Sequence, residues 1–193
     1  MTKKGKIYAI FFGILFGGYV LYRLVAASGA PKEFEDARMK GATISQDIVN
    51  LSNQVKDDLL VVNQLDKEWR YNEAFAKAQE VADKTKEIRG KAVELSNQLQ
   101  VMTSSLSKIG GEEAKQAVLE SVSNRLALLS RLINYSDYIS QLVSVLRDRF
   151  TGNSGSATTV SVLVDQINAE VTAINSFNQS ATAAMSRFDK ALP

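Results

Sequence analysis

The feature that most restricts the fold of this chain is a stretch without proline that covers nearly all of it. The two prolines stand at positions 31 and 193, so residues 32–192 contain none. Apolar residues recur along this stretch at steps of three and four, the period of a helix with one buried face. The clearest stripe consists of Tyr71, Ala74, Ala78, Val81, Thr85, Ile88, Ala92, Leu95, Leu99, Met102, Leu106 and Ile109. This pattern predicts long helices that pack in the manner of a coiled coil.

Three breaks divide the stretch into helices of similar length. Gly110 and Gly111 predict a helix end, and the segment TGNSGS at 151–156 predicts a loop. The apolar spacing also slips between Trp69 and Tyr71, which favours a turn near residues 63–67 over one continuous first helix. We therefore predict an all-α fold, an antiparallel helical bundle or coiled coil of three to four long helices at about 31–65, 67–109, 112–150 and 158–192.

The helix expected at 112–150 carries a wider apolar stripe than the others. Its members include Val118, Leu126, Leu132 and Ile133, which together exceed a strict coiled-coil seam. A stripe of this width predicts that the helix packs against two neighbours.

The N-terminal segment predicts a single membrane-spanning helix. Residues 7–22 are apolar and uncharged, Lys3, Lys4 and Lys6 precede them, and Arg23 follows. We predict a basic tail at 1–6, a transmembrane signal-anchor at 7–27 and a bundle domain at 31–193. The alternative is a secretory signal that is cleaved to leave a mature chain beginning at Ser28 or Pro31. For the anchored form we expect a cytoplasmic N-terminus and an exported helical domain.

Small residues recur within the expected anchor at intervals of four. Ala9, Gly13 and Gly17 lie on one face of that helix. Such a face lets two membrane helices approach closely, so these residues are candidates for helix packing in the membrane.

Composition excludes several classes of site. The chain has no cysteine and no histidine, which removes disulfides, thiol nucleophiles, the common zinc sites and Ser-His-Asp triads. Residues 1–23 hold four of the 23 Lys and Arg residues and none of the 21 acids, so the remainder has 19 − 21, a net charge of −2. A nucleic-acid partner would call for a basic face. We predict no enzyme activity, no cofactor, no metal site and no nucleic-acid partner.

The last expected helix has an unusually neutral polar face. Residues 151–186 contain only two charged side chains, Asp165 and Glu170. Interface cores are depleted in charge, so the candidate partner surface is Ala169, Thr172, Ala173, Ser176, Ser180 and Ala183. Asn178 occupies a seam position of the same helix, where a buried asparagine more often fixes register or oligomeric state than binds a ligand.

These features predict a membrane-anchored bundle that serves as a structural, scaffolding or protein-interaction module at a membrane surface. Its expected partners are the membrane and either another protein or a second copy of the chain. One alternative is a ligand- or lipid-binding envelope bundle, with a pocket lined by small residues such as Ala74, Ala78 and Ala92. Another is a secreted bundle released by signal cleavage.

Overall fold

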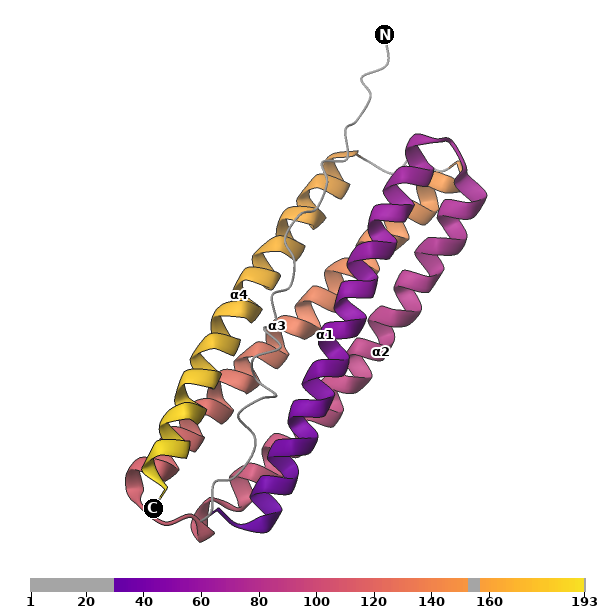
Figure 1. Ribbon diagram of the computed structural model, residues 1–193. Coiled ribbons are helices and arrows are strands. Elements are labelled where there is room, and N and C mark those ends of the chain that lie inside the picture. The colour runs from indigo at the N-terminus through magenta and orange to yellow at the C-terminus, as the bar shows by residue number, and fades with distance from the viewer. Residues whose placement is uncertain (1–29, 153–156, 193) are drawn as a thin grey trace.

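The computed structural model describes residues 30–152 and 157–192, and within these ranges the fold is helical. Four long helices, α1 (Lys32–Lys67), α2 (Tyr71–Ser104), α3 (Glu112–Phe150) and α4 (Ala157–Ala191), run up and down side by side (Figure 1). A short 3₁₀ helix, η2 (Leu106–Lys108), lies between α2 and α3. The predicted all-α bundle is therefore confirmed.

The bundle is built from two antiparallel hairpins, α1–α2 and α3–α4, which meet through α2 and α3. An ion pair joins the two helices of each hairpin: Lys91 Nζ lies 3.1 Å from Asp47 Oδ2, and Arg187 Nη2 lies 2.6 Å from Glu120 Oε2. The backbones of α1 and α4 hardly approach each other, in contrast to the three other neighbouring pairs. The interface between α1 and α4 is thus the loosest side of the bundle.

The core follows the apolar stripes of the sequence. Every member of the predicted α2 stripe from Ala74 to Met102 is buried. The largest fully buried side chains of the bundle are Phe34, Ile48, Ile88, Leu99, Leu132, Ile139, Ile174 and Phe188. Each such side chain contributes about 1.5–3 kcal/mol by its removal from water, so the core rather than helix propensity holds the four helices together.

The turn between α1 and α2 comprises residues 68–70, slightly later than the predicted 63–67. Trp69 adopts a left-handed conformation (φ 62°), the Arg70 N–H donates to Leu65 O (3.0 Å), and the Trp69 N–H donates to Asp66 O (3.2 Å). These two bonds form a Schellman motif, in which the left-handed position is usually glycine. The Trp69 ring contacts the Tyr71 ring edge-on, at 5.9 Å between centroids.

The second helix ends earlier than the sequence predicts. α2 stops at Ser104, and Gly111, with φ 79°, precedes α3 instead of capping α2. Ser104 Oγ and Ser105 Oγ both donate to Val101 O, at 2.9 and 3.0 Å. These bonds lie at the point where α2 ends and η2 begins.

None of the helices within residues 30–152 and 157–192 is both long and apolar enough to cross a membrane. The predicted anchor at 7–27 lies outside the described residues, as do its packing residues Ala9, Gly13 and Gly17.

Candidate functional site

The outer surface of α3 carries an uncovered apolar stripe. Leu119, Leu126 and Ile133 are 50%, 47% and 42% exposed, although the sequence analysis placed Leu126 and Ile133 in the buried stripe. Their spacing of seven residues keeps them on one helix face, and the exposed Ser123 and Ser130 lie between them. The apolar width of α3 therefore exceeds what α2 and α4 cover, and we call these five residues the α3 stripe.

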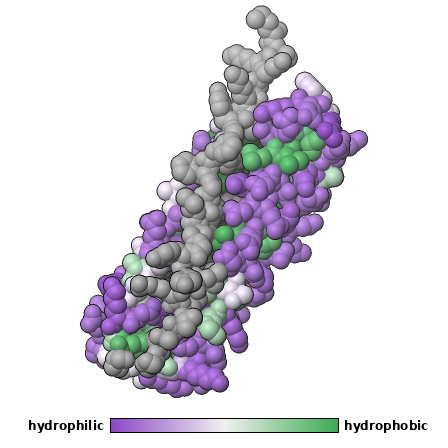
Figure 2. All heavy atoms as spheres, in the orientation of Figure 1, coloured by the Kyte–Doolittle hydropathy of each residue, from purple (hydrophilic) through white to green (hydrophobic). Residues whose placement is uncertain are grey.

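The predicted partner surface on α4 is solvent-accessible in the bundle. Ala169, Thr172, Ser176, Ser180 and Ala183 are exposed, and Ala173 is half-buried. Glu170, one of the two charged residues of this segment, is buried and faces Arg131 of α3 at 3.6 Å. This surface is therefore more neutral in the fold than in the sequence. By contrast, the face of the bundle drawn in Figure 2 is mostly hydrophilic outside the grey atoms, with separate hydrophobic patches.

A cluster at one end of the bundle joins α1 to α4. The rings of Phe34 and Phe188 lie 5.1 Å apart between centroids. The Arg38 guanidinium donates to both carboxylate oxygens of Asp189, at 2.7 and 2.8 Å, and lies over the Phe188 ring. We call these four residues the α1–α4 clamp, because they join two helices whose backbones hardly approach each other.

Beyond the clamp, the interface between α1 and α4 is lined by small polar side chains. Steps of seven residues stay on one helix face, and such steps from Arg38 and Asp189 reach Ser45 and Ser52 on α1, and Thr182, Asn175 and Asn168 on α4. Ser52 Oγ, Thr182 Oγ1 and the Oδ1 atoms of both asparagines are buried without a hydrogen-bond partner among the described residues. A buried polar atom without a partner costs about 1–3 kcal/mol, so this polar seam is an unusual choice for a bundle core.

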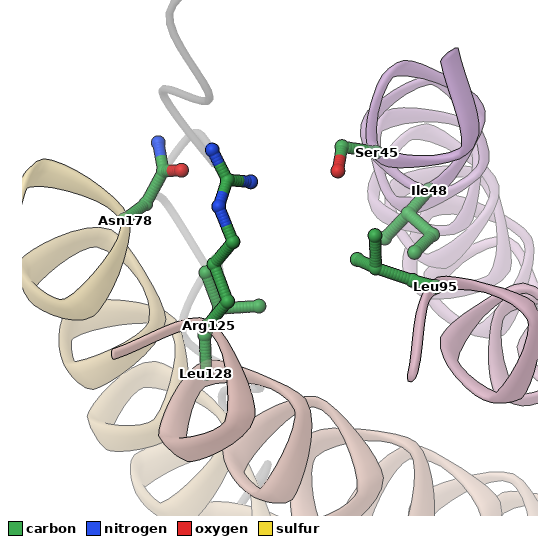
Figure 3. Close-up of a pocket in the computed structure, with 6 residues that line it drawn as sticks. All are labelled: Ser45, Ile48, Leu95, Arg125, Leu128 and Asn178. Carbon is green, nitrogen blue, oxygen red and sulfur yellow. The ribbon is translucent and has the colours of Figure 1, made fainter. Parts of the chain in front are cut away.

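A small cavity opens on this seam. Ser45 and Ile48 of α1, Leu95 of α2, Arg125 and Leu128 of α3, and Asn178 of α4 line it, and its volume is about 10 Å³. That volume is close to the room that one water molecule needs. In Figure 3 the Arg125 guanidinium stands beside the Asn178 amide, and Ser45 lies across the gap on α1. All four helices thus contribute to a cavity that is lined by three aliphatic and three polar side chains.

Two arginines of the described ranges, Arg125 and Arg147, have no ion pair with another described residue, and of these Arg147 is exposed whereas Arg125 is half-buried. Arg38, Arg70, Arg89, Arg131, Arg149 and Arg187 each lie within 4.0 Å of a carboxylate. Within the described residues, no carboxylate lies that close to Arg125, and its Nε is buried without a hydrogen-bond partner. Burial lowers the pKa of Arg125, and the positive charge of Arg38 lowers it further. Arginine nevertheless stays protonated at neutral pH, so the cavity contains a positive charge.

Two carboxyl groups of α1 also have shifted pKa values. Burial raises the pKa of Glu35, with the negative charge of Asp189 adding to the effect and Arg38 opposing it. Burial likewise raises the pKa of Asp66, which lies 3.0 Å from Arg149 of α3. Each of the two carboxyl groups is also ion-paired, Glu35 with Arg38 and Asp66 with Arg149.

The sequence analysis missed Arg125, although the chain contains a signal for it. Residues at steps of seven along α3 are Val118, Arg125, Leu132, Ile139 and Leu146, and the four others are buried and apolar. A charged residue in a core series marks either a buried ion pair or a ligand site. The predicted pocket alanines, Ala74, Ala78 and Ala92, are instead buried on α2 and do not line this cavity.

Within the described residues, no group of three or more Asp and Glu side chains is arranged to hold a metal ion. The chain matches no protein-family model, no curated protein and no solved structure.

Proposed function

We propose that this chain is a membrane-tethered helical bundle that acts as a scaffolding module by binding a second copy of itself. The observation that carries the proposal is the α3 stripe. Leu119, Leu126 and Ile133 are three exposed apolar side chains on one face of α3, and their seven-residue spacing is that of a coiled-coil seam. The row from 119 to 133 extends over about 21 Å of helix, which is long enough for a partner helix to lie along it.

The chemistry of the stripe favours a copy of the same chain as partner. The serines between the apolar residues are small, so a second α3 can approach closely in an antiparallel or parallel arrangement. A two-fold contact of this kind is self-complementary, as most homodimer interfaces are. The neutral surface of α4 offers a second contact that places no like charges opposite each other.

The tether in this proposal is the apolar segment 7–27, with the bundle on the exported side. Helix rise gives the long helices of 34–39 residues a length of about 50–60 Å. A self-associating bundle of this length would space or cluster whatever is attached to it near the membrane.

The test uses the full chain, recovered from the membrane fraction after a carbonate wash and purified in mild nonionic detergent. Light scattering behind size exclusion gives the protein mass over a concentration series. We expect a discrete oligomer for the wild type, a monomer for Leu126→Lys, and a weakened oligomer for Ala169→Lys combined with Ala173→Lys. Val101→Lys is the matched control, because Val101 is similarly exposed (41%) but lies on α2.

Three results would overturn parts of the proposal. A wild-type chain that stays monomeric at the highest concentration removes self-association. An oligomer that survives Leu126→Lys as well as it survives Val101→Lys assigns assembly to a surface other than the α3 stripe. Recovery of the chain in the soluble fraction removes the tether.

A further inference from the structure

The starting point is a pair of opposite charges at the two ends of the α3 stripe. Lys115 lies one turn before Leu119, and Asp137 lies one turn after Ile133. Residues four apart share a helix face, so both charges belong to the face of the stripe. Both side chains are partly exposed. The apolar row therefore has a cation at one end and an anion at the other.

The spacing of these residues is symmetric about Leu126. Lys115 and Asp137 are each 11 residues from Leu126, and Leu119 and Ile133 are each seven residues from it. When two copies of α3 pair antiparallel with a two-fold axis at Leu126, each Leu119 faces Ile133 of the other copy. The same axis places each Lys115 opposite Asp137 of the other copy.

A parallel pair would bring like charges together. In a parallel two-fold contact each residue faces its own copy, so Lys115 would meet Lys115 and Asp137 would meet Asp137. The apolar residues of the α3 stripe fit both arrangements. Like charges in an interface disfavour the arrangement that juxtaposes them, so the charges at the two ends favour the antiparallel pair.

The ion pairs within each chain are compatible with the antiparallel contact. Lys115 Nζ lies 2.8 Å from Glu112 Oε1, and Arg89 Nη1 donates to Asp137 Oδ1 at 2.8 Å. A contact between Lys115 of one copy and Asp137 of the other joins these two pairs into a row of alternating sign. Isolated surface pairs contribute little, whereas several charges in one network can contribute measurably.

Helix α2 widens the apolar surface beside the stripe. Arg89 on α2 pairs with Asp137 on α3, and the two helices run antiparallel (Figure 1). One turn further in the same direction brings Val93 of α2 level with Ile133 of α3. Val93 is 63% exposed. A helix that lies along the α3 stripe can therefore contact Val93 as well.

We propose that two copies of the chain pair through α3 in an antiparallel arrangement. Leu126 lies at the two-fold axis, and Lys115 of each copy forms an ion pair with Asp137 of the other. This inference rests on the proposed self-association and adds the orientation of the partner and the two charged residues that select it.

The antiparallel pair directs its two tethers toward opposite ends. The start of α3 lies at the same end of the bundle as the start of α1, since Lys108 Nζ just before α3 lies 2.6 Å from Glu33 Oε2. Glu112 is 14 residues from Leu126, or about 21 Å, so the two tethered ends are about 42 Å apart along the dimer. For both tethers to enter one membrane, the two bundles have to lie along its surface.

The first test reverses the charges in the full chain. Sedimentation equilibrium in density-matched nonionic detergent gives the dissociation constant of the dimer. Lys115→Glu and Asp137→Lys each place like charges opposite each other, and we expect each to raise this constant about tenfold at low salt. The double variant restores opposite charges and should recover most of the wild-type affinity. Glu113→Lys is the matched control, because Glu113 is exposed on another face of α3, and it should leave the constant unchanged.

The second test determines the orientation with introduced cysteines, since the chain has none. Ser123 and Ser130 are exposed and lie on either side of Leu126. In the antiparallel pair Ser123 of one copy is level with Ser130 of the other, whereas the two Ser123 positions are about 9 Å apart along the axis. We expect mild oxidation to cross-link Ser123→Cys chains with Ser130→Cys chains in a mixture, and to leave either variant alone largely monomeric in denaturing gels.

Three outcomes would overturn the antiparallel pair while self-association stands. The first is a dimer that both charge reversals weaken no more than Glu113→Lys does. The second is a double variant that recovers no affinity lost in the single variants. The third is efficient cross-linking of Ser123→Cys with itself, which would show a parallel pair. A wild type that stays monomeric in the same sedimentation experiment would instead remove the proposed function. If a charge variant does not fold, the cysteine variants decide, because they replace serine by a residue of similar size.

Discussion

Replacement of Phe188 by alanine tests whether the α1–α4 clamp closes the bundle. Phe188 is fully buried, and its ring contacts both the Phe34 ring, at 5.1 Å between centroids, and the Arg38 guanidinium, at 5.8 Å. Truncation of a buried phenylalanine to alanine typically costs about 3–5 kcal/mol, because transfer free energy is lost and a cavity remains. Since the backbones of α1 and α4 hardly approach each other, neighbouring residues cannot easily fill that cavity. We expect a loss at the upper end of this range.

The assay is urea unfolding of the full chain, followed by far-UV circular dichroism, for Phe188→Ala, Phe34→Ala and the double variant. The double-mutant cycle should give a coupling free energy of about 0.5–1.5 kcal/mol for the ring pair. Val162→Ala on α4 is the control, because Val162 is half exposed and its truncation should change stability by less than about 0.5 kcal/mol. A loss below about 1.5 kcal/mol for Phe188→Ala, or additive single variants, would refute the clamp as the closing contact.

Two further predictions concern backbone conformation and pH. Gly90→Ala should raise the free energy of unfolding by about 0.5–1 kcal/mol, because an added Cβ meets nothing within 4 Å there. Gly111→Ala should lower it by about 1–2 kcal/mol, because Gly111 has a φ of 79°. Urea unfolding measures both changes, and equal effects of the two substitutions would contradict the conformational argument. Burial raises the pKa of Asp66, so its contribution to stability is fully present below the ordinary aspartate pKa and is lost as the pH rises through the raised folded value. Unfolding of the wild type and of Asp66→Asn across pH 4–7 should therefore show the wild type losing stability relative to the variant as the pH rises, and a constant difference would contradict the shift.

The helical content and the core of α2 could be predicted because both follow from side-chain period alone. The ends of the helices could not, because they depend on hydrogen bonds that composition does not reveal. At the α1–α2 turn a tryptophan takes the left-handed position that glycine usually marks. α2 ends at Ser104, before the Gly110-Gly111 pair is reached, and the 3₁₀ helix η2 follows it.

The candidate sites, too, could be predicted from the sequence only in part. The neutral surface of α4 was visible in the sequence because charge is counted directly. The exposure of Leu126 and Ile133 could not be predicted, because the width of an apolar stripe does not show how much of it the neighbouring helices cover. The isolation of Arg125 was also hidden, because an ion pair depends on which carboxylates the fold brings near.

The α1–α4 clamp also determines how the bundle responds to mechanical force. It places the start of α1 and the end of α4 together, with Phe34 against Phe188. A load applied between Pro31 and Leu192 therefore peels the two outer helices apart from one end, so that contacts break one after another. A pull between the α1–α2 turn at Trp69 and Leu192, at opposite ends of the bundle, would instead shear many side-chain contacts at once. The bundle is thus weak against a load between the start of α1 and the end of α4, and stiff along its length.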